Sequence, residues 1–354
     1  MKKQVRVALT CTIVSCAAIA GGVGACVGSD PQTSTDSGVL TDATTTPSDT
    51  GRPADDASDA RASTDGPVIP ASPDAGSDAR VPTCAGQPFG APVRVDSSQI
   101  TAAIASTMWG PRVVGTTAIF AATPTGSNEQ QIFRATYTPP PGGVGAPSLS
   151  NASILAPPSS TAVVEWAPTM ARDNSFLVAT TGFPLPRDLA VSSSVGGGAF
   201  GPAVRIAALS EADRDESDPY LVGAPTAKAL YFGRDAVGGN FSIYRAAVTG
   251  PATFGPASRV VLACPLANCG TPVPTPNEAL LMFGAWVAGG FVPGVQEAVL
   301  TVAGASASAT GLVDHPELGA HYPSWVSDDG CEVLLGGGPV STVAEVAYAR
   351  RAPK

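Results

Sequence analysis

The chain has few of the residues on which most catalytic and metal sites depend. Among its 354 residues there are two histidines, and charged side chains make up only 14% of the chain. It contains no Cys-x-x-Cys pair and no Gly-x-Ser-x-Gly motif. The shortage of imidazoles argues against a serine-type triad, and the missing cysteine pair argues against a thiolate metal site.

Long helical patterns are also absent, whereas residues that form turns are plentiful. The chain has 39 glycines and 34 prolines, which excludes a helical protein and favours one with many short strands and turns. Its net charge is −9, and residues 27–354 alone carry −12, because the first 26 residues contain three basic groups and no acid. So acidic a protein is not expected to bind nucleic acid.

Residues 1–26 have the pattern of a secretory signal peptide. Basic residues at the start precede an apolar run from Val7, which is too short and too early for an ordinary membrane span. The end of this segment, Val23-Gly24-Ala25-Cys26, resembles the bacterial lipobox, which implies lipidation of Cys26. Cys16 is a poorer lipidation site because it shortens the apolar run, and a non-lipidated signal is the alternative. By resemblance to Gram-negative lipoproteins, Val27 favours the outer membrane.

Residues 27–83 are expected to form a disordered tether. They consist mostly of Ser, Thr, Asp, Ala, Pro and Gly, and all 21 aromatic residues of the protein lie after position 84. Such a segment buries too little apolar surface to offset the entropy of ordering its backbone. Its root-mean-square reach is roughly 40 Å, so it can serve as a spacer between a lipid anchor and a folded domain.

Residues 84–354 contain a repeat of about 50 residues, marked by five prolines. Each proline is followed by a turn and an apolar strand, and a third strand often comes next. A period near 50 with four strands in each unit predicts an all-β, five-bladed β-propeller. The marker prolines are Pro111, Pro168, Pro219, Pro272 and Pro323.

A recurring outer strand predicts how the ring closes. Residues 200–206 and 254–260 share a Phe-Gly-Pro-Ala start and end the second and third units, whereas the similar residues 89–95 precede the first unit. The fifth unit has no such strand after it. Because an open ring would expose two strand edges, we expect residues 89–95 to pair with the last blade.

Four cysteines follow Cys26, and an even number in an exported domain predicts disulfides. Three pairings are possible. Cys264 and Cys269 flank a four-residue loop and are expected to pair with each other, which leaves Cys84 for Cys331. That second bond would join the sealing strand to the fifth blade, and closing so long a loop contributes about 4–5 kcal/mol in the chain-entropy model. Metal-bound thiols are the alternative.

The stretch Tyr322–Gly330 carries a resemblance to a known family. It reads Pro-x-Trp-x-Ser-x-Asp-Gly before an apolar strand, and it resembles the WD-like repeat of TolB-type propellers. Residues 218–245 form a looser copy, and the resemblance extends over about 105–345. It implies a propeller that acts as a binding platform at the cell envelope, with the motif serving the fold and carrying no chemistry.

The residues just before the marker prolines are the candidates for a ligand site. They are expected to lie at one mouth of the central channel, where tryptophan rings beside carboxylates suit a sugar. Alternatively, Trp109, Trp166 and Trp325 only fill space between blades. The candidate residues are Trp109, Glu165, Trp166, Asp218 and His321.

Three other motifs favour structural interpretations. Residues 314–321 hold both histidines with two acids, but Pro316 breaks the spacing needed for a helical metal site, so a solvated connector is expected. The acidic run at 211–218 lacks the Gly and Glu of a calcium loop and is interpreted as a solvated loop. Residues 196–201 match Gly-x-Gly-x-x-Gly but no helix follows, which predicts a hairpin loop. No metal or cofactor is therefore predicted.

Together these patterns predict a non-catalytic lipoprotein of the outer membrane. Its partners would be the membrane, through the lipid anchor, and an envelope protein or glycan, through the propeller. The main alternative is a carbohydrate-active enzyme of the glycoside hydrolase type that uses carboxylates in the channel. A purely structural surface protein is a third possibility.

Overall fold

A computed structural model describes residues 81–157, 165–182, 186–235, 239–288, 294–337 and 346–352. The chain divides into two units, 1–69 and 70–354, and every described residue belongs to the second. The predicted signal peptide, its Cys26 and the tether up to residue 80 lie outside the described residues. Among those described, none belongs to a helix with the length and hydropathy needed to cross a bilayer.

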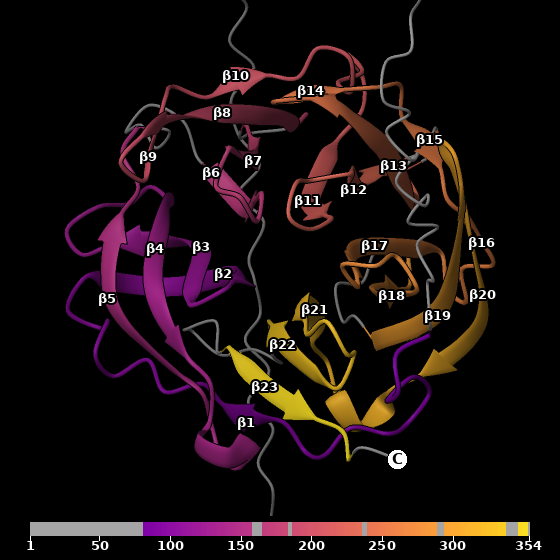
Figure 1. The fold of residues 1–354 in the computed structure, drawn as a ribbon, viewed down its shortest axis with the longest axis horizontal. Coiled ribbons are helices and arrows are strands. Elements are labelled where there is room, and N and C mark those ends of the chain that lie inside the picture. Colours follow the sequence, from indigo (N-terminus) through magenta and orange to yellow (C-terminus); the bar gives the residue numbers. More distant parts are fainter. Residues whose placement is uncertain are drawn as a thin grey trace, which may run out of the picture. The chain divides into compact units, whose positions relative to one another are not determined.

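The described part of the second unit is a five-bladed β-propeller, as predicted (Figure 1). Each blade is a small, mostly antiparallel sheet whose first strand lies nearest the axis. Blade one comprises β2 (Ile104–Val114), β3 (Thr117–Pro124), β4 (Gln131–Thr138) and β5 (Ser148–Ile154). Blade two comprises β6 (Glu165–Met170), β7 (Phe176–Thr181), β8 (Asp188–Gly196), β9 (Ala199–Phe200) and β10 (Val204–Arg205).

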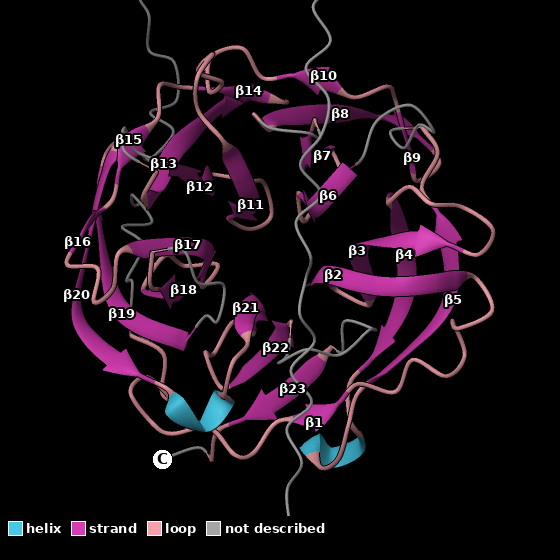
Figure 2. Cartoon of the chain, turned by 180° about the vertical axis from the view of Figure 1, so that it is seen from behind, coloured by secondary structure: helices cyan, strands magenta, loops and turns pink. Residues whose placement is uncertain are grey.

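The remaining three blades follow the same plan (Figure 2). Blade three comprises β11 (Glu216–Val222), β12 (Ala229–Asp235), β13 (Phe241–Gly250), β14 (Thr253–Phe254) and β15 (Ser258–Arg259). Blade four comprises β17 (Asn268–Pro274), β18 (Leu280–Trp286), β19 (Gly294–Ala303), β20 (Ser306–Asp314) and, parallel to β20, β16 (Val261–Leu262). Blade five comprises β21 (Tyr322–Val326), β22 (Glu332–Gly336), β23 (Ala347–Arg350) and β1 (Val93–Arg94). Two 3-10 turns span Pro141–Gly143 and Pro316–Leu318.

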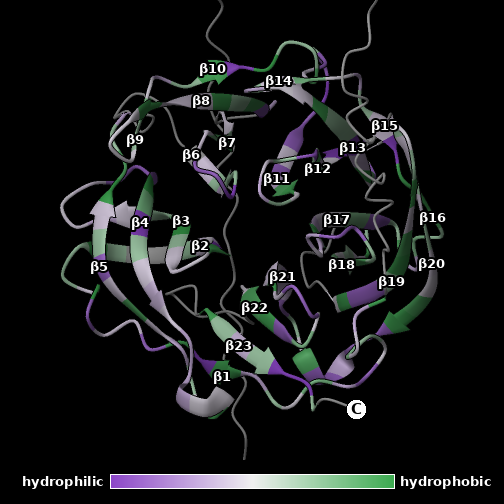
Figure 3. Ribbon diagram, in the orientation of Figure 1, coloured by the Kyte–Doolittle hydropathy of each residue, from purple (hydrophilic) through white to green (hydrophobic). Residues whose placement is uncertain are grey.

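Apolar side chains fill the spaces between neighbouring blades. Figure 3 shows hydrophobic colour concentrated on the strands and hydrophilic colour on many of the loops between them. Leu334 and Tyr348 of blade five pack in one cluster with Phe120 of blade one, and Phe176 of blade two packs with Phe232 of blade three. Each fully buried aromatic or branched side chain contributes about 1.5–3 kcal/mol, so face-to-face packing around the ring is the main stabilising term.

The N-terminal strand closes the ring, as predicted. In β1, Val93 pairs with Tyr348 and Arg94 with Ala347, both in the antiparallel sense, and an isolated bridge joins Phe89 to Arg351. The chain then passes to blade one, where the Asp96 amide donates to the Pro147 carbonyl over 2.9 Å. The opening segment therefore covers the outer edge of blade five and connects it to blade one.

Both disulfides form in the predicted pairing. Cys84 is bonded to Cys331 across 247 positions of sequence, with 5.2 Å between the two Cα atoms, and Cys264 is bonded to Cys269. The first bond holds the segment that leads into β1 against the loop before β22. Disulfides persist in oxidising compartments, so these bonds are consistent with an exported domain.

A buried ionic cluster joins the two ends of the propeller to blade four. Arg351, 1% exposed, donates to the Cys84 carbonyl over 2.5 Å and to the Glu297 carboxylate. Glu297 also accepts from the Gly86 amide over 2.6 Å. The Arg351 guanidinium lies 3.9 Å from the centroid of the Phe89 ring, a cation–π contact. Residues near both ends of the propeller thus share one buried carboxylate.

His315 belongs to this cluster, which corrects the expectation of a solvated connector. Its ring is 2% exposed, and its Nδ1 lies 3.0 Å from Oε1 of Glu317, which also accepts from the Phe89 amide over 2.9 Å. Its Nε2 lies 3.6 Å from Oε2 of Glu297. Through these contacts His315 helps to hold together the segments that carry Glu297, Glu317 and Arg351. Among the described residues no group of three or more His, Cys, Asp or Glu could hold a metal ion.

The acidic run at 211–218 is also less solvated than expected. Glu216 is fully buried, and its carboxylate accepts from Arg234 over 2.9 Å. Asp215 is 8% exposed and accepts from Arg187 over 2.7 Å. These acids are therefore paired with arginines of blades two and three, because an ionised carboxylate is stable in a protein interior only with a hydrogen-bonded counter-charge.

The ionic cluster predicts how stability depends on pH. Burial alone would raise the pKa of Glu297, but hydrogen bonds from His315 and Arg351 outweigh it and lower the pKa to about 2. A carboxylate whose pKa is lower in the folded state than in the unfolded state stabilises the fold fully when the pH is above the unfolded-state pKa. That contribution is lost as the pH falls through the folded-state pKa. We expect the wild type to lose about 3 kcal/mol through this group between pH 5 and pH 2.

The comparison is between Glu297→Gln and the control Glu129→Gln, which alters a loop carboxylate with no ion pair among the described residues. Thermal unfolding of the full chain is followed from pH 7 to pH 2. Glu297→Gln should be less stable at neutral pH and lose less on acidification than either the wild type or the control. Parallel pH curves for all three proteins would show that Glu297 does not stabilise the closure.

Candidate functional site

The five marker prolines all lie in the innermost strands, β2, β6, β11, β17 and β21. In four blades the pairing with the second strand shifts register across the proline, as at Ser217–Tyr220 in β11. In β21 the shift comes directly after Pro323, which is itself paired with Leu335. Proline has no N–H to donate to a ladder, so a bulge is the expected consequence. An irregularity next to the axis therefore recurs in every blade, at the proline in four blades and just after it in blade five.

The residue before the proline has a left-handed backbone in four of the five blades. The φ angles are +56° for Gly110, +44° for Ala167, +53° for Asp218 and +47° for Thr271. This conformation is unfavourable for residues other than glycine, and helical conformations of either hand are uncommon before proline. Backbone strain repeated around one axis is typical of a functional centre.

A cavity of about 190 Å³ opens beside these bulges, toward the N-terminal ends of the inner strands. Each blade contributes one aromatic ring to its wall: Trp109 of β2, Trp166 of β6, Phe241 of β13, Trp286 of β18 and Tyr322 of β21. The other lining residues are Arg187, Ser217, Asp218 and Thr271. We call this cavity the aromatic mouth.

The rings form two groups on the wall of the aromatic mouth. The Trp109 centroid lies 4.9 Å from that of Trp166 and 6.0 Å from that of Tyr322, whose plane is within 8° of parallel. Phe241 and Trp286 form the second group, with centroids 5.9 Å apart. Contacts among the rings fix their orientations, because offset and tilted aromatic pairs at these distances attract each other.

Glycine backbones make room for two of these rings. A Cβ at Gly270 would lie 2.7 Å from the Trp286 ring, and a Cβ at Gly336 would lie 2.7 Å from the Tyr322 ring. Gly336 ends the second strand of blade five, and Tyr322 pairs with it across the sheet. Any larger residue at either position would displace an aromatic wall of the cavity.

The polar residues that line the cavity differ in their hydrogen-bond partners and burial. Arg187 donates to the Asp215 carboxylate from Nε and Nη2, over 2.7 and 2.5 Å, and its guanidinium lies 5.8 Å from the centroid of a Trp166 ring. Asp218 is half-buried and accepts from the Ser217 hydroxyl over 3.1 Å. Burial raises the pKa of the Asp218 carboxyl, although the charges of Arg187 and Arg112 oppose the rise.

The structure brings together three of the predicted site residues, Trp109, Trp166 and Asp218. Glu165 is the first residue of β6, but its side chain lies outside the described residues. His321 does not line the aromatic mouth, because its Nδ1 lies 2.6 Å from the Leu318 carbonyl in the connector before β21. Whether these residues bind a ligand remains a prediction.

Sequence reasoning missed six of the nine lining residues. Tyr322 and Thr271 directly precede marker prolines, so applying the same rule to all five blades would have found them. Ser217 precedes Asp218 and could have been found in the same way. No proline marks Phe241, Trp286 or Arg187, which come from the second and third strands of their blades or from the residue before such a strand.

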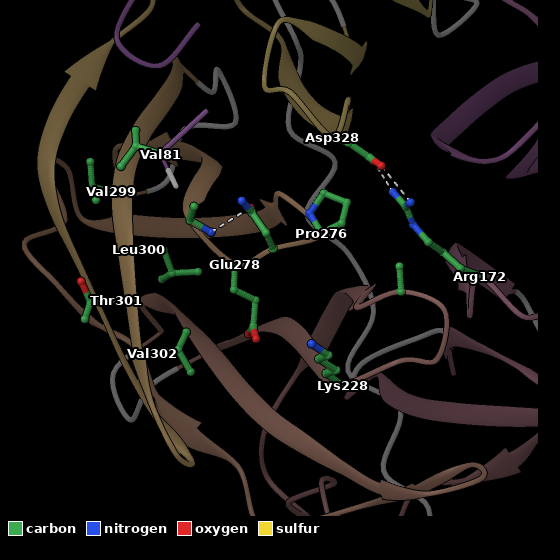
Figure 4. A pocket seen from close by; sticks show the side chains of 13 residues that line it. Val81, Arg172, Lys228, Pro276, Glu278, Val299, Leu300, Thr301, Val302 and Asp328 are labelled. Atoms are coloured by element: carbon green, nitrogen blue, oxygen red, sulfur yellow. Dashed lines mark hydrogen bonds and ion pairs between the residues drawn. The ribbon is translucent and has the colours of Figure 1, made fainter. Parts of the chain in front are cut away.

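A wider hollow of about 730 Å³ lies at the other end of the inner strands (Figure 4). There Arg172, in the turn after β6, donates from Nη1 to Asp328, in the turn after β21, over 3.0 Å. This pair connects blades two and five, which are not neighbours in the ring. Glu278, also in the wall, is held by Arg245 over 2.9 Å and by the Tyr231 hydroxyl over 2.6 Å.

Comparisons with known proteins find similar folds. TolB from Acinetobacter baumannii is 11% identical over 70% of this chain and 56% of that one, with a TM-score of 0.36. A thermostable family-43 glycoside hydrolase is 12% identical over 70% of this chain and 89% of that one, with a TM-score of 0.49. A family 117 glycoside hydrolase from Zobellia galactanivorans is 13% identical over 75% of this chain and 90% of that one, with a TM-score of 0.46.

The aligned part thus spans just over half of the Acinetobacter chain. At such identities and scores, these likenesses carry no argument about function. No protein-family model and no curated protein sequence matches the chain. The choice between a binding protein and an enzyme therefore depends on the residues of the site.

The residues with a left-handed backbone should respond unusually to substitution by glycine. Ala167 has a φ of +44°, so Ala167→Gly should relieve backbone strain of about 1–2 kcal/mol, which offsets the methyl contact and chain entropy that glycine loses. We expect the melting temperature to change by no more than about 2 °C. The control Ala179→Gly, at a buried position of β7 in the same blade, should lower it clearly. Equal losses in both variants would show that Ala167 is unstrained.

Proposed function

We propose that this protein is a non-catalytic binding protein of the cell envelope, and that the aromatic mouth binds one sugar unit of a glycan. The observation that carries the proposal is the ring of five aromatic side chains, one from each blade, around a cavity with one described carboxylate. Apolar faces of a sugar ring pack on aromatic faces, while its hydroxyls need a few fixed polar partners. Asp218, Ser217 and Thr271 supply such partners.

The size of the cavity supports a small ligand unit. Pockets for drug-sized molecules usually measure about 300–1,000 Å³, whereas the aromatic mouth measures about 190 Å³. A single ring would fill it, and the rest of a glycan would extend over the surface. Because the rings come from strands packed into the propeller, the cavity needs little rearrangement to bind, which reduces the entropic cost of association.

The enzyme alternative depends on a second carboxylate. Glycoside hydrolases generally use two, about 5–5.5 Å apart in retaining enzymes and 6.5–9.5 Å apart in inverting ones. Among the described lining residues only Asp218 is acidic, and Glu165, which directly precedes Trp166 in the sequence, is the candidate for the other. The burial of Asp218 favours this alternative, because burial raises the pKa of its carboxyl and a general acid needs a raised pKa.

The proposed location follows from the sequence pattern at the start of the chain. A lipid on Cys26 would anchor the protein in the outer membrane, and residues 27–83 would hold the propeller at a distance from the bilayer. A propeller held there would lie within reach of envelope glycans. The two disulfides support an oxidising compartment, as expected for an exported protein.

Binding of the full chain to an array of neutral hexose and N-acetylhexosamine oligosaccharides, including peptidoglycan fragments, tests the proposal. Trp109→Leu and Trp166→Leu should each weaken binding by about 30-fold, as expected for aromatic residues at the centre of an interface. Trp325→Leu is the matched control, because that ring packs toward Tyr137 between blades five and one. Circular dichroism checks that each variant is folded.

A turnover measurement decides between the binding protein and the enzyme. We expect no cleavage of any bound oligosaccharide, and reduced binding in the double variant Glu165→Gln, Asp218→Asn. Cleavage by the wild type that this double variant abolishes would establish the enzyme instead. Failure to bind any glycan, or equal binding by the Trp109 and Trp325 variants, would refute a sugar site at the aromatic mouth.

A further inference from the structure

Arg112 is a buried cation without a hydrogen-bonded counter-charge. It lies in β2 next to the axis and is 4% exposed, yet its Nε and Nη1 have no hydrogen-bond partner. Its guanidinium carbon lies 4.5 Å from the centroid of the Tyr220 ring. A cation–π contact offsets only part of the cost of removing a guanidinium from water, so a buried arginine is normally paired with an anion.

No described carboxylate fills that role. Asp218 attracts Arg112 through space, but its hydrogen bond among the described residues is with Ser217. Burial lowers the pKa of Arg112 to about 10, which still leaves the guanidinium charged at neutral pH. Two guanidinium nitrogens that are desolvated and unpaired cost several kcal/mol unless something outside the protein chain accepts from them.

Arg112 also lines a small cavity. It measures about 20 Å³, and its walls include Arg112, Tyr220, Thr169 and Arg172. A cavity of this size exceeds the roughly 10–15 Å³ that one ordered water needs, and it has room for one small monoatomic ion. It is separate from the aromatic mouth, whose lining residues it does not share.

The chemistry of the walls favours an anion over water. The Thr169 hydroxyl oxygen accepts from the Leu221 amide over 3.0 Å, which leaves its proton available for donation. Arg172 is paired with Asp328, so its charge is already neutralised, whereas that of Arg112 is not. A water molecule could accept hydrogen bonds here but would not balance the Arg112 charge, and a monoatomic anion would do both.

We propose that this axial cavity is a halide site, in which Arg112 binds a chloride ion through Nε and Nη1. The ion links β2 of blade one to β6 and β11, because Thr169 and Tyr220 stand in the same wall. Its role is to neutralise the one arginine at the axis that the described carboxylates leave without a hydrogen-bonded partner. The site is independent of the proposed sugar site.

Thermal unfolding of the full chain in sodium chloride and in sodium methanesulfonate, at equal ionic strength, tests the proposal. Methanesulfonate is too large for a cavity of about 20 Å³. Chloride should raise the melting temperature of the wild type by about 2–4 °C, because a ligand that binds only the native state stabilises it. Arg112→Met should abolish the difference. The control Arg205→Met, at an exposed arginine paired with Asp188, should retain it.

Bromide provides a second measurement that does not need a variant. In crystals of the wild type grown with sodium bromide, anomalous scattering should show a peak within hydrogen-bonding distance of Arg112 Nε. The proposal is overturned if the cavity contains only water under these conditions. It is also overturned if melting is the same in the two salts, or if Arg112→Met responds to chloride as the wild type does.

Discussion

The pairing of β1 with β23 is the constraint on which the rest of this propeller depends. Without it, blade five would expose the N–H and C=O groups of its last strand, and such an edge tends to pair with other chains. Two further interactions reinforce the closure, the Cys84–Cys331 disulfide and the buried Glu297–Arg351 pair. Backbone pairing and a covalent bond thus hold the N-terminal segment to blade five, and the ion pair holds Arg351, next to β23, to β19 of blade four.

Closure matters for the site because it brings the Tyr322 ring of blade five into the wall of the aromatic mouth. Its five rings come from five blades, and Tyr322 of blade five lies 6.0 Å from Trp109 of blade one across the closing interface. If that interface opened, Trp109 would lose the Tyr322 ring that stacks on it. Ligand binding and stability of the closure are therefore linked, since a ligand that contacts all five blades stabilises the closed ring.

The fold could be predicted because its signals are local and repeated. A marker proline lies in the innermost strand of every blade. The Phe-Gly start of residues 89–95 identifies them, by similarity to residues 200–206 and 254–260, as the outer strand that blade five lacks. The aromatic mouth was predicted only in part, because Phe241 and Trp286 reach it from strands that carry no marker. His315 was misjudged for a related reason. Its burial depends on Glu297, Arg351 and Phe89, which are distant in sequence and come together only when the ring closes.

Mapping the disulfides of the full chain tests the closure most directly. Digestion without reduction, followed by mass spectrometry, identifies which cysteine peptides remain linked. If the N-terminal segment closes the propeller, a peptide containing Cys84 should be linked to one containing Cys331, and Cys264 should be bonded to Cys269. A chain in which Cys84 is free, or linked to Cys264 or Cys269, would contradict it, because residue 84 would not then be held against blade five.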